Sequence, residues 1–396
     1  MSEWKKCQLE EVAEVQTGPF GSQLKNEQYI NGGTPVVTVE HIDNFRIIDF
    51  EYPSVTEEDK DRLSKYLLKA GDIIFTRVGS VDLSAYVKPH QDGWMFSSRM
   101  LRVRPNQSVD SRFLSYFFQQ KRFREYILNI SVGATMPSIN TEILKGIPVS
   151  YPSLPEQKAI VSVLSSLDDK IDLLHRQNKT LEAMAETLFR QWFVEEAHDD
   201  WDDRCLLEII QLIGGGTPKT SIDEYWGGDI PWISGGDIAS NHKSVILSTD
   251  KNITKVGLNN SSTKLLPKYA TVISARGTVG KFCLLAQPMA FSQSNYGILP
   301  NIKECFFFTY LLINHLVEEL QSSAYGSVFD TITTSTFKEI KLPLPTDSEI
   351  ILFDQSVSSY LKKIFLNKSQ ILTLEKLRDT IMPKLMSGEV RIEYEN

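Results

Sequence analysis

The chain of 396 residues contains only four cysteines, and no two of them have a CxxC spacing. We therefore expect reduced thiols rather than a disulfide framework or a zinc site. Long apolar runs are also scarce: the most apolar stretch, residues 305–317, is too short to cross a bilayer and includes Asn314 and His315, which predicts a buried helix. The first residues, MSEWKKCQLEE, lack the apolar stretch of a signal peptide. These absences favour a cytoplasmic protein.

Motifs for nucleotide or cofactor chemistry are missing as well. The glycines before Lys219 and Lys281 are wrongly spaced for a GxxxxGK phosphate loop. The sequence has neither an FxGxG cofactor loop nor the Asp/Asn-Pro-Pro-aromatic motif that DNA amino-methyltransferases use. The six histidines are dispersed, which favours neither a zinc site nor a catalytic triad. We therefore expect no cofactor, no metal and no catalytic residues in this chain.

One nuclease-like pattern remains, in which Asp330 is followed by Glu339 and Lys341. Carboxylates at such a spacing can hold a divalent ion near a lysine. The repeat counterparts of the last two residues are Gly146 and Pro148. A glutamate and a lysine at the end of a strand explain the pattern more simply, and a metal-dependent nuclease is retained as an alternative.

The most prominent positive feature is a duplication with an offset of about 193 to 199 residues. The stretch GDIIFTR, which ends at Arg77, corresponds to ATVISAR, which ends at Arg276. Other matched pairs are Trp4 with Trp201, Phe96-Ser97 with Phe291-Ser292, Gly133 with Gly326, and Glu156 with Glu349. A period this long indicates a duplicated domain, because solenoid repeats run about 20 to 50 residues.

The net charge of −8 argues against nucleic-acid binding only if it is spread evenly. Half of it falls in residues 151–199, which carry 5 Lys and Arg against 9 Asp and Glu. Residues 99–124 hold seven Lys and Arg opposed only by Asp110, and residues 251–281 hold six with no acid. A solvated charged face explains either run alone, but two runs in two copies favour a polyanionic partner.

Each copy ends in a capping box, Ser153 with Glu156 and Thr346 with Glu349, that predicts the start of a long helix. Pro383 predicts a kink or an early end in the second helix. A heptad stripe follows each box, typical of a coiled-coil seam. Its central positions are Leu164, Leu167, Ile171, Leu174, Asn178 and Leu181 in the first helix, and Val357, Tyr360, Ile364, Asn367, Ile371 and Leu374 in the second.

We predict that the two helices pack against each other as an antiparallel coiled coil; contact with another subunit is the alternative. A polar residue within such a seam costs stability and often fixes the register, as expected for Asn178 and Asn367. The predicted fold class is α+β, with two tandem mixed α/β domains separated by the helices and related by a pseudo-two-fold axis. The boundaries are 1–152 and 199–345 for the domains, and 153–198 and 346–396 for the helices and the C-terminal tail.

The amino-acid sequence of several segments, together with the duplicated architecture, resembles that of the specificity subunit of type I restriction-modification systems. These segments are GGGTP from Gly214, RGTVGK from Arg276, LPEQKAIVSVLSSLDDKIDLL from Leu154 and LEAMAETLFRQWF from Leu181. The resemblance covers nearly the whole chain. It implies a non-catalytic subunit whose two target recognition domains each read one half of a bipartite, asymmetric site on double-stranded DNA.

The resemblance also implies partners. The helices would set the spacer between the half-sites and dock two methyltransferase subunits, which bind S-adenosylmethionine and methylate adenine. Restriction and translocase subunits that use ATP and Mg can join such a complex.

The expected DNA contacts lie in small, polar loops beside basic residues, which suit phosphate contact and base-edge reading. A purely structural coiled-coil adaptor without sequence-dependent DNA binding is a further alternative. The candidate contacts are Arg77, Ser97, Ser98, Arg99 and Thr135 in the first domain, and Lys219, Arg276, Lys281, Gln293, Ser294 and Asn295 in the second.

Overall fold

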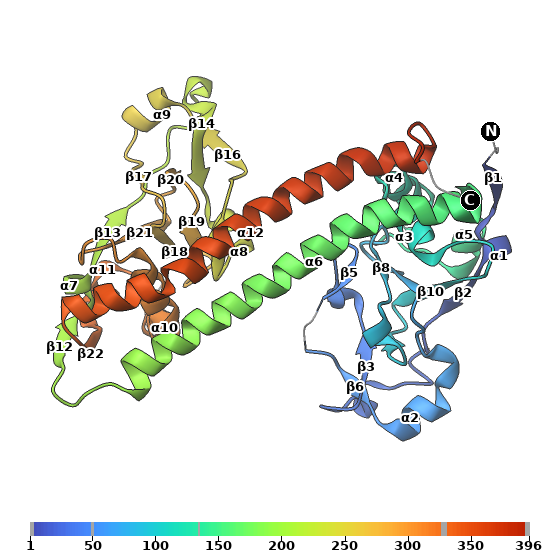
Figure 1. The fold of residues 1–396 in the computed structure, drawn as a ribbon, viewed down its shortest axis with the longest axis horizontal. Coiled ribbons are helices and arrows are strands. Elements are labelled where there is room, and N and C mark those ends of the chain that lie inside the picture. The colour runs from blue at the N-terminus through green and yellow to red at the C-terminus, as the bar shows by residue number, and fades with distance from the viewer. Residues whose placement is uncertain (1–3, 49–50, 134, 326–330, 393–396) are drawn as a thin grey trace. The chain divides into compact units, whose positions relative to one another are not determined.

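Figure 1 shows the computed structural model of the chain, which describes residues 4–48, 51–133, 135–325 and 331–392. The chain divides into two compact units. The first combines Met1–Asp169 with Glu375–Asn396, and the second is Lys170–Leu374. Each unit therefore holds one mixed domain together with a segment of each long helix. Among the described residues, no helix has the length and apolar character needed to cross a membrane.

The first domain is built on a four-stranded antiparallel sheet with the order β2-β10-β7-β8. A smaller sheet has the order β6-β3-β9, in which β3 and β9 are parallel. The elements are, in chain order, β1 (Lys5–Gln8), α1 (Leu9–Val12), β2 (Ala13–Thr17), β3 (Thr34–Val37), β4 (Ile42–Asp43), β5 (Arg46–Ile47), β6 (Ser54–Val55), α2 (Glu57–Arg62), β7 (Ile73–Thr76), β8 (Ser84–Tyr86), β9 (Met95–Phe96), β10 (Met100–Pro105), α3 (Ser111–Gln119), α4 (Lys121–Ile130), α5 (Thr141–Lys145) and β11 (Pro148–Tyr151).

The core of the first domain lies between its central sheet and α3 and α4. Phe75 of β7 packs edge-on against Phe118, with ring centroids 4.8 Å apart. The carboxylate of Asp110 caps α3 by accepting from the backbone amides of Arg112 and Phe113. The helical stretch of residues 111–130 is divided at Gln120, whose extended backbone (ψ 137°) separates α3 from α4.

The second domain has the same organisation. Its central sheet has the order β13-β21-β18-β19-β15, and its smaller sheet has the order β16-β14-β20-β17. Its elements are β12 (Asp202–Cys205), α7 (Leu206–Ile209), β13 (Ile210–Gly214), β14 (Trp226–Ile233), α8 (Gly235–Ser240), β15 (Ser244–Ile246), β16 (Lys251–Ile253), α9 (Lys255–Asn259), β17 (Leu265–Leu266), β18 (Thr271–Ser274), β19 (Phe282–Leu285), β20 (Met289–Phe291), β21 (Asn295–Pro300), α10 (Phe306–Tyr325), α11 (Thr334–Glu339) and β22 (Lys341–Leu344).

The strand pairing of the two domains corresponds element by element. The antiparallel run β2-β10-β7-β8 is matched by β13-β21-β18-β19, and the parallel pair β3-β9 by β14-β20. The outer pair β1-β11 is matched by β12-β22. The strands β15 and β17 extend the sheets of the second domain. The internal repeat in the sequence is therefore a repeat of topology.

Two long helices begin where the capping boxes predict, α6 (Leu154–Arg190) and α12 (Asp347–Ser387). The Glu349 carboxylate accepts from the backbone amide of Thr346 at 3.0 Å, as a capping box requires. At its end α6 widens into a π-helical turn, Gln191–Glu195. Pro383 lies inside α12, and the helix ends before Gly388, whose φ of +74° suits glycine.

Within each unit the helix segments pack in antiparallel fashion, because rising numbers on α6 meet falling numbers on α12. In the second unit Ile171 and Leu174 form a cluster with Ile371 and Leu374. In the first unit, segments of both helices join the domain core through Ile160, Leu164, Met382, Leu385 and Met386. The predicted α+β class with two mixed domains and long paired helices is confirmed.

The seam asparagines bond to each other. Asn367 Nδ2 donates to Asn178 Oδ1 at 2.9 Å, and both side chains are buried. Asn178 Nδ2 and Asn367 Oδ1 have no partner among the described residues. Of the other seam positions, Val357 and Ile364 are buried, whereas Leu167, Leu181 and Tyr360 are partly buried.

Candidate nucleic-acid interface

One edge of the central sheet gathers the candidate residues of the first domain. The register pairs Leu101 with Thr17 and Met100 with Thr76, so the ends of β2 and β7 meet the start of β10 there. The loop after α4 joins the same edge, because the amide of Ile139 donates to the carbonyl of Arg77 at 2.9 Å. Loops that are distant in sequence therefore form one continuous edge.

The second domain builds the same edge from β13, β18 and β21. The register places Gly214 beside Tyr296 and Ser274 beside Asn295. The amide of Ile332 donates to the carbonyl of Ala275 at 3.1 Å, which corresponds to the Ile139 bond of the first domain. The edge of each domain thus has the same backbone plan.

These bonds correct one pairing made from the sequence. The backbone of Arg77 occupies the place of Ala275, because the amide of Arg77 donates to Arg99 and that of Ala275 to Ser294. Arg276 lies one residue further, in the exposed loop before β19. The two arginines therefore occupy positions on their edges that differ by one residue.

In the first domain the candidates differ in exposure. Arg99 and Thr135 are exposed and Ser98 is partly buried. Arg77 is partly buried, and its Nη1 donates to Thr17 Oγ1 at 3.4 Å. Ser97 is buried, and its hydroxyl has no partner among the described residues.

In the second domain Lys219, Arg276 and Gln293 are exposed, whereas Lys281 and Ser294 are partly buried. Asn295 is only 1% exposed. Its Nδ2 donates to Ser292 Oγ at 2.8 Å, and its Oδ1 has no partner among the described residues. This side chain faces the inside of the edge rather than its surface.

Most arginines of the first basic run, residues 99–124, bind acids of their own domain, so few of them are free to contact a polyanionic partner. Arg102 is 1% exposed and donates to Glu14 at 2.8 Å. Arg104 binds both oxygens of Asp72 at 2.7 Å, and this hydrogen bonding raises the pKa of Arg104. Arg124 likewise binds Asp82. Arg99 remains as the exposed arginine of the run at the sheet edge.

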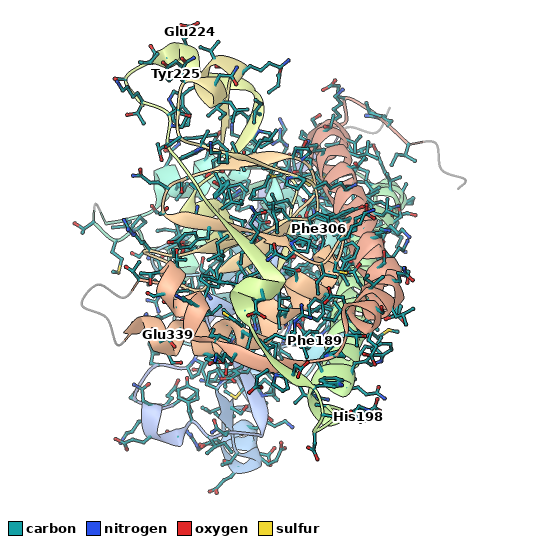
Figure 2. All side chains as sticks on the ribbon, turned by 90° about the vertical axis from the view of Figure 1, so that its left-hand side faces the viewer. Phe189, His198, Glu224, Tyr225, Phe306 and Glu339 are labelled. Carbon is teal, nitrogen blue, oxygen red and sulfur yellow. The ribbon has the colours of Figure 1, made fainter. Side chains whose placement is uncertain are left out.

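The second basic run is different, because none of its six cations forms an ion pair with a described residue. Lys251 lies over the ring of Trp226 at 5.8 Å, and Lys268 over that of Tyr269 at 4.8 Å. Figure 2 shows Glu224 and Tyr225, just before β14, at one end of the second unit and His198 near its opposite end. Exposed lysines stand on this β14–α9 lobe and on the loops beside it: Lys251, Lys255, Lys264 and Lys268.

His242 lies near two further lysines, Lys281 and Lys243. Its Nδ1 lies 3.3 Å from the amide of Phe282, at the start of β19 and therefore at the sheet edge. Burial lowers the pKa of His242, and the charges of Lys281 and Lys243 lower it further. The two lysine charges that disfavour an added proton on His242 favour an anion beside it.

The nuclease-like pattern gains no support from geometry. Glu339 ends α11 and Lys341 begins β22, and both are exposed. Asp330 lies outside the described residues. Among the residues that the structure describes, no group of three or more His, Cys, Asp or Glu side chains could hold a metal ion.

The repeated architecture agrees with a family model described as the type I restriction modification DNA specificity domain, which matches residues 1–183 and 198–378. The chain belongs to this specificity family. The MjaIX type I restriction enzyme specificity subunit of Methanocaldococcus jannaschii is 25% identical and aligns with 99% of this chain and 94% of its own length. The HindI specificity subunit of Haemophilus influenzae is 24% identical, with 98% and 100% coverage.

A solved structure has the same fold. The crystal structure of the type I restriction-modification S subunit from M. genitalium superposes with a TM-score of 0.64 at 16% identity, and covers 100% of this chain and 97% of its own. At this identity the similarity concerns the fold. Recognition of DNA is implied by membership of the specificity family.

Sequence reasoning missed a second surface, on the outward faces of the helices. Leu173 and Met184 of α6 are 39% and 41% exposed, and Leu366 and Leu377 of α12 are 66% and 47% exposed. Each residue of the first pair lies 193 positions before its counterpart in the second. Large apolar residues outside the heptad seam, repeated with the offset of the duplication, are the signal that could have revealed this outward stripe.

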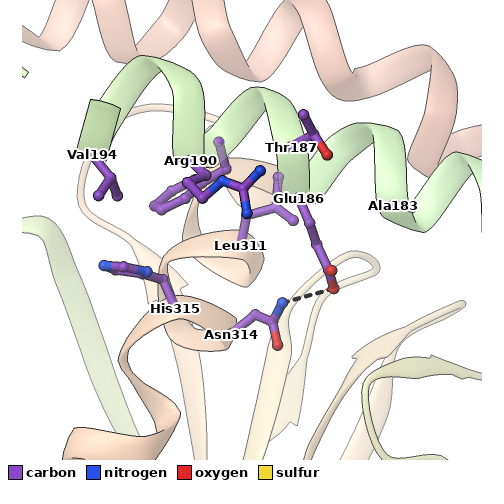
Figure 3. A pocket seen from close by; sticks show the side chains of 9 residues that line it. Ala183, Glu186, Thr187, Arg190, Val194, Leu311, Asn314 and His315 are labelled. Atoms are coloured by element: carbon purple, nitrogen blue, oxygen red, sulfur yellow. Dashed lines mark hydrogen bonds between the residues drawn. The ribbon is translucent and has the colours of Figure 1, made fainter. Parts of the chain in front are cut away.

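A hollow of about 330 Å³ lies near this stripe, between the end of α6 and α10 in the second unit (Figure 3). Glu186 Oε1 accepts from Asn314 Nδ2 at 2.9 Å across it. Arg190 and His315 line it together with the exposed Val194. Its mixed polar and apolar lining suits a protein side chain more than a nucleic acid.

Proposed function

We propose that this chain is the DNA-reading subunit of a type I methyltransferase or restriction complex, and that each recognition domain reads one half of a bipartite, asymmetric site. The observation that carries the proposal is the repeated sheet edge, with one backbone plan and different exposed side chains in its two copies. Similar edges with different side chains suit two different half-sites. Arginine can pair with guanine O6 and N7, and glutamine with adenine N6 and N7.

The two domains grip phosphate differently under this proposal. The first domain offers Arg99 and a partly buried Arg77 at its edge, since Arg102, Arg104 and Arg124 are paired with acids. The second offers the unpaired lysines of the β14–α9 lobe and its neighbouring loops. Phosphate contacts position a protein on the duplex, and base contacts provide the specificity. The second domain should therefore contribute most of the salt-dependent binding energy.

The paired helices set the unread spacer between the half-sites. The buried Asn178–Asn367 bond permits one register of the two helices, since any slip would leave both amides unpaired in an apolar seam. A fixed register gives a fixed helix length between the domains. DNA that fits both domains must then have a spacer of one length.

Two methyltransferase subunits dock on the outward stripe. Its two copies, Leu173 with Met184 and Leu366 with Leu377, provide two similar apolar sites for two identical partners. The partners bind S-adenosylmethionine and methylate adenine, and restriction subunits that use ATP and Mg can join them. This chain contributes recognition and geometry rather than a reacting group.

The direct test is to coexpress the chain with its methyltransferase partner and to map methylated adenines across a genome. The expected result is one asymmetric, bipartite motif with a constant spacer. Methylation without a sequence motif, or a single continuous motif, would reject the proposal. Cleavage of DNA by the purified chain alone with a divalent ion would favour the nuclease alternative instead.

A further inference from the structure

One turn is built in the same way in both domains, and we name it the recognition turn: residues 96–100 in the first domain and 291–295 in the second. Ser97 N donates to the carbonyl of Val37, and Ser292 N to that of Ile233, both at 2.9 Å. Each turn is also closed by a bond to the carbonyl of its serine, from the amide three residues later, at 3.0 and 3.2 Å. The backbone of the turn is therefore shared.

The backbone of each recognition turn lies in close contact with a glycine that follows the first strand of the central sheet. A Cβ atom on Gly18 would lie 2.1 Å from the carbonyl oxygen of Ser97, and one on Gly215 would lie 2.1 Å from that of Ser292. Such contacts with backbone leave no room for any side chain. The same close approach sets the distance between the turn and the glycine backbone in both domains.

The side chains at the tip of the turn differ between the copies. The tip reads Ser98-Arg99 in the first domain and Gln293-Ser294 in the second. Arg99 and Gln293 are exposed. Each copy thus presents one long hydrogen-bonding side chain on a common backbone.

The second turn is braced by its other polar residues. Asn295 Nδ2 donates to Ser292 Oγ, and Ser292 Oγ lies 2.9 Å from Ser294 Oγ. Gln293 has no side-chain hydrogen bond to a described residue. The bracing network therefore uses the neighbours of Gln293 and leaves its amide available to a ligand.

We infer that the two tip residues of the recognition turn are the exchangeable determinant of each half-site, Ser98-Arg99 for the first and Gln293-Ser294 for the second. The inference rests on the proposed function, since it assigns a reading position within a DNA-reading edge. Arg99 pairs with a guanine and Gln293 with an adenine, each through two hydrogen bonds. Asn295, Gly18 and Gly215 are positioning residues, which hold the turn and touch no base.

The test exchanges the tips in the full-length chain, coexpressed with its methyltransferase partner, and selects bound duplexes from randomised DNA. The variant Q293S/S294R should move one position of the second half-site from adenine toward guanine by about 5- to 150-fold. The first half-site and the spacer should stay unchanged. The reciprocal variant S98Q/R99S should alter only the first half-site, and Q211A, at an exposed glutamine of β13, should alter neither.

Unchanged half-sites in both exchanges would overturn the inference and leave the proposed function standing, because the unmodified chain would still select a bipartite site. An unmodified chain with no sequence preference would reject the proposed function itself. If an exchanged chain binds no DNA, the base preference of the variant Q293A is measured instead. Relaxed preference at one position supports the inference, and loss of binding to all sequences by a folded Q293A chain overturns it.

Discussion

At the scale of single residues, two neighbouring arginines of the first basic run, Arg99 and Arg102, differ in burial and in bonding. Arg102 is buried, donates to Glu14 and also donates to the carbonyls of Lys65 and Leu67 at 3.2 and 3.3 Å. Burial lowers the pKa of Arg102, and the nearby acids oppose this effect. Arg99 is exposed at the sheet edge. The sequence gives both arginines the same charge. Their burial distinguishes a structural role for Arg102 from the DNA contact proposed for Arg99.

The substitution R102A should therefore destabilise the first domain by about 2 to 4 kcal/mol, because it removes the bonds of a buried guanidinium to Glu14 and to the Lys65 carbonyl and opens a cavity. R99A should leave stability within about 0.5 kcal/mol and weaken DNA binding instead. Hydrogen exchange of β10 peptides, with DNA affinity measured in parallel, separates the two effects. Equal protection of β10 in both variants would contradict the assignment.

His242 should report on the approach of DNA. Its pKa is lowered by burial and by Lys281 and Lys243, so bound phosphate should raise it again. A ligand that raises a pKa binds more tightly as the pH falls through that range. We expect DNA affinity to increase from pH 8 to pH 5.5 in the unmodified chain, and to increase less in H242Q. The same pH dependence in both chains would place the phosphates elsewhere.

At the scale of elements, the helix pair combines strength with selectivity at the Asn178–Asn367 layer. N178L alone should destabilise the pair by about 1 to 3 kcal/mol, because the buried Asn367 amide loses its 2.9 Å acceptor and keeps only a 3.5 Å contact with Gln177. The double variant N178L/N367L should be at least as stable as the unmodified chain, since it removes both buried amide side chains. A double-mutant cycle of unfolding free energies measures the coupling, and additive effects would show that the asparagines do not act as a pair.

The outward stripe should bind partners independently at its two copies. Leu366 is 66% exposed, so L366E should leave folding unchanged and lower the number of bound methyltransferase subunits from two to one. L173E should do the same at the other copy. The matched control is L265E, at a residue of β17 that is 47% exposed but lies outside the helices. Native mass spectrometry counts the subunits, and two partners on both helix variants would move the docking site elsewhere.

At the scale of the whole molecule, the architecture could be predicted from the sequence more accurately than the contacts of individual residues could. Capping boxes and heptads act over a few turns, so they located the starts of α6 and α12 and the buried asparagines. The one-residue shift between Arg77 and Arg276 depends on strand register, which is set by pairing between segments distant in sequence. The burial of Arg102 and Asn295 likewise depends on tertiary packing, which composition and spacing do not encode.

Under the proposed function, the paired helices set the distance between two different DNA-reading edges, and lengthening both helices tests this most directly. Inserting seven residues into each helix at the Asn178–Asn367 layer preserves the heptads and adds about 10 Å, or roughly 3 base pairs of B-DNA. In a complex with methyltransferase, mapping of methylated adenines should then give both original half-sites with a spacer longer by about 3 base pairs. An unchanged spacer, or a motif reduced to one half-site, would contradict the account.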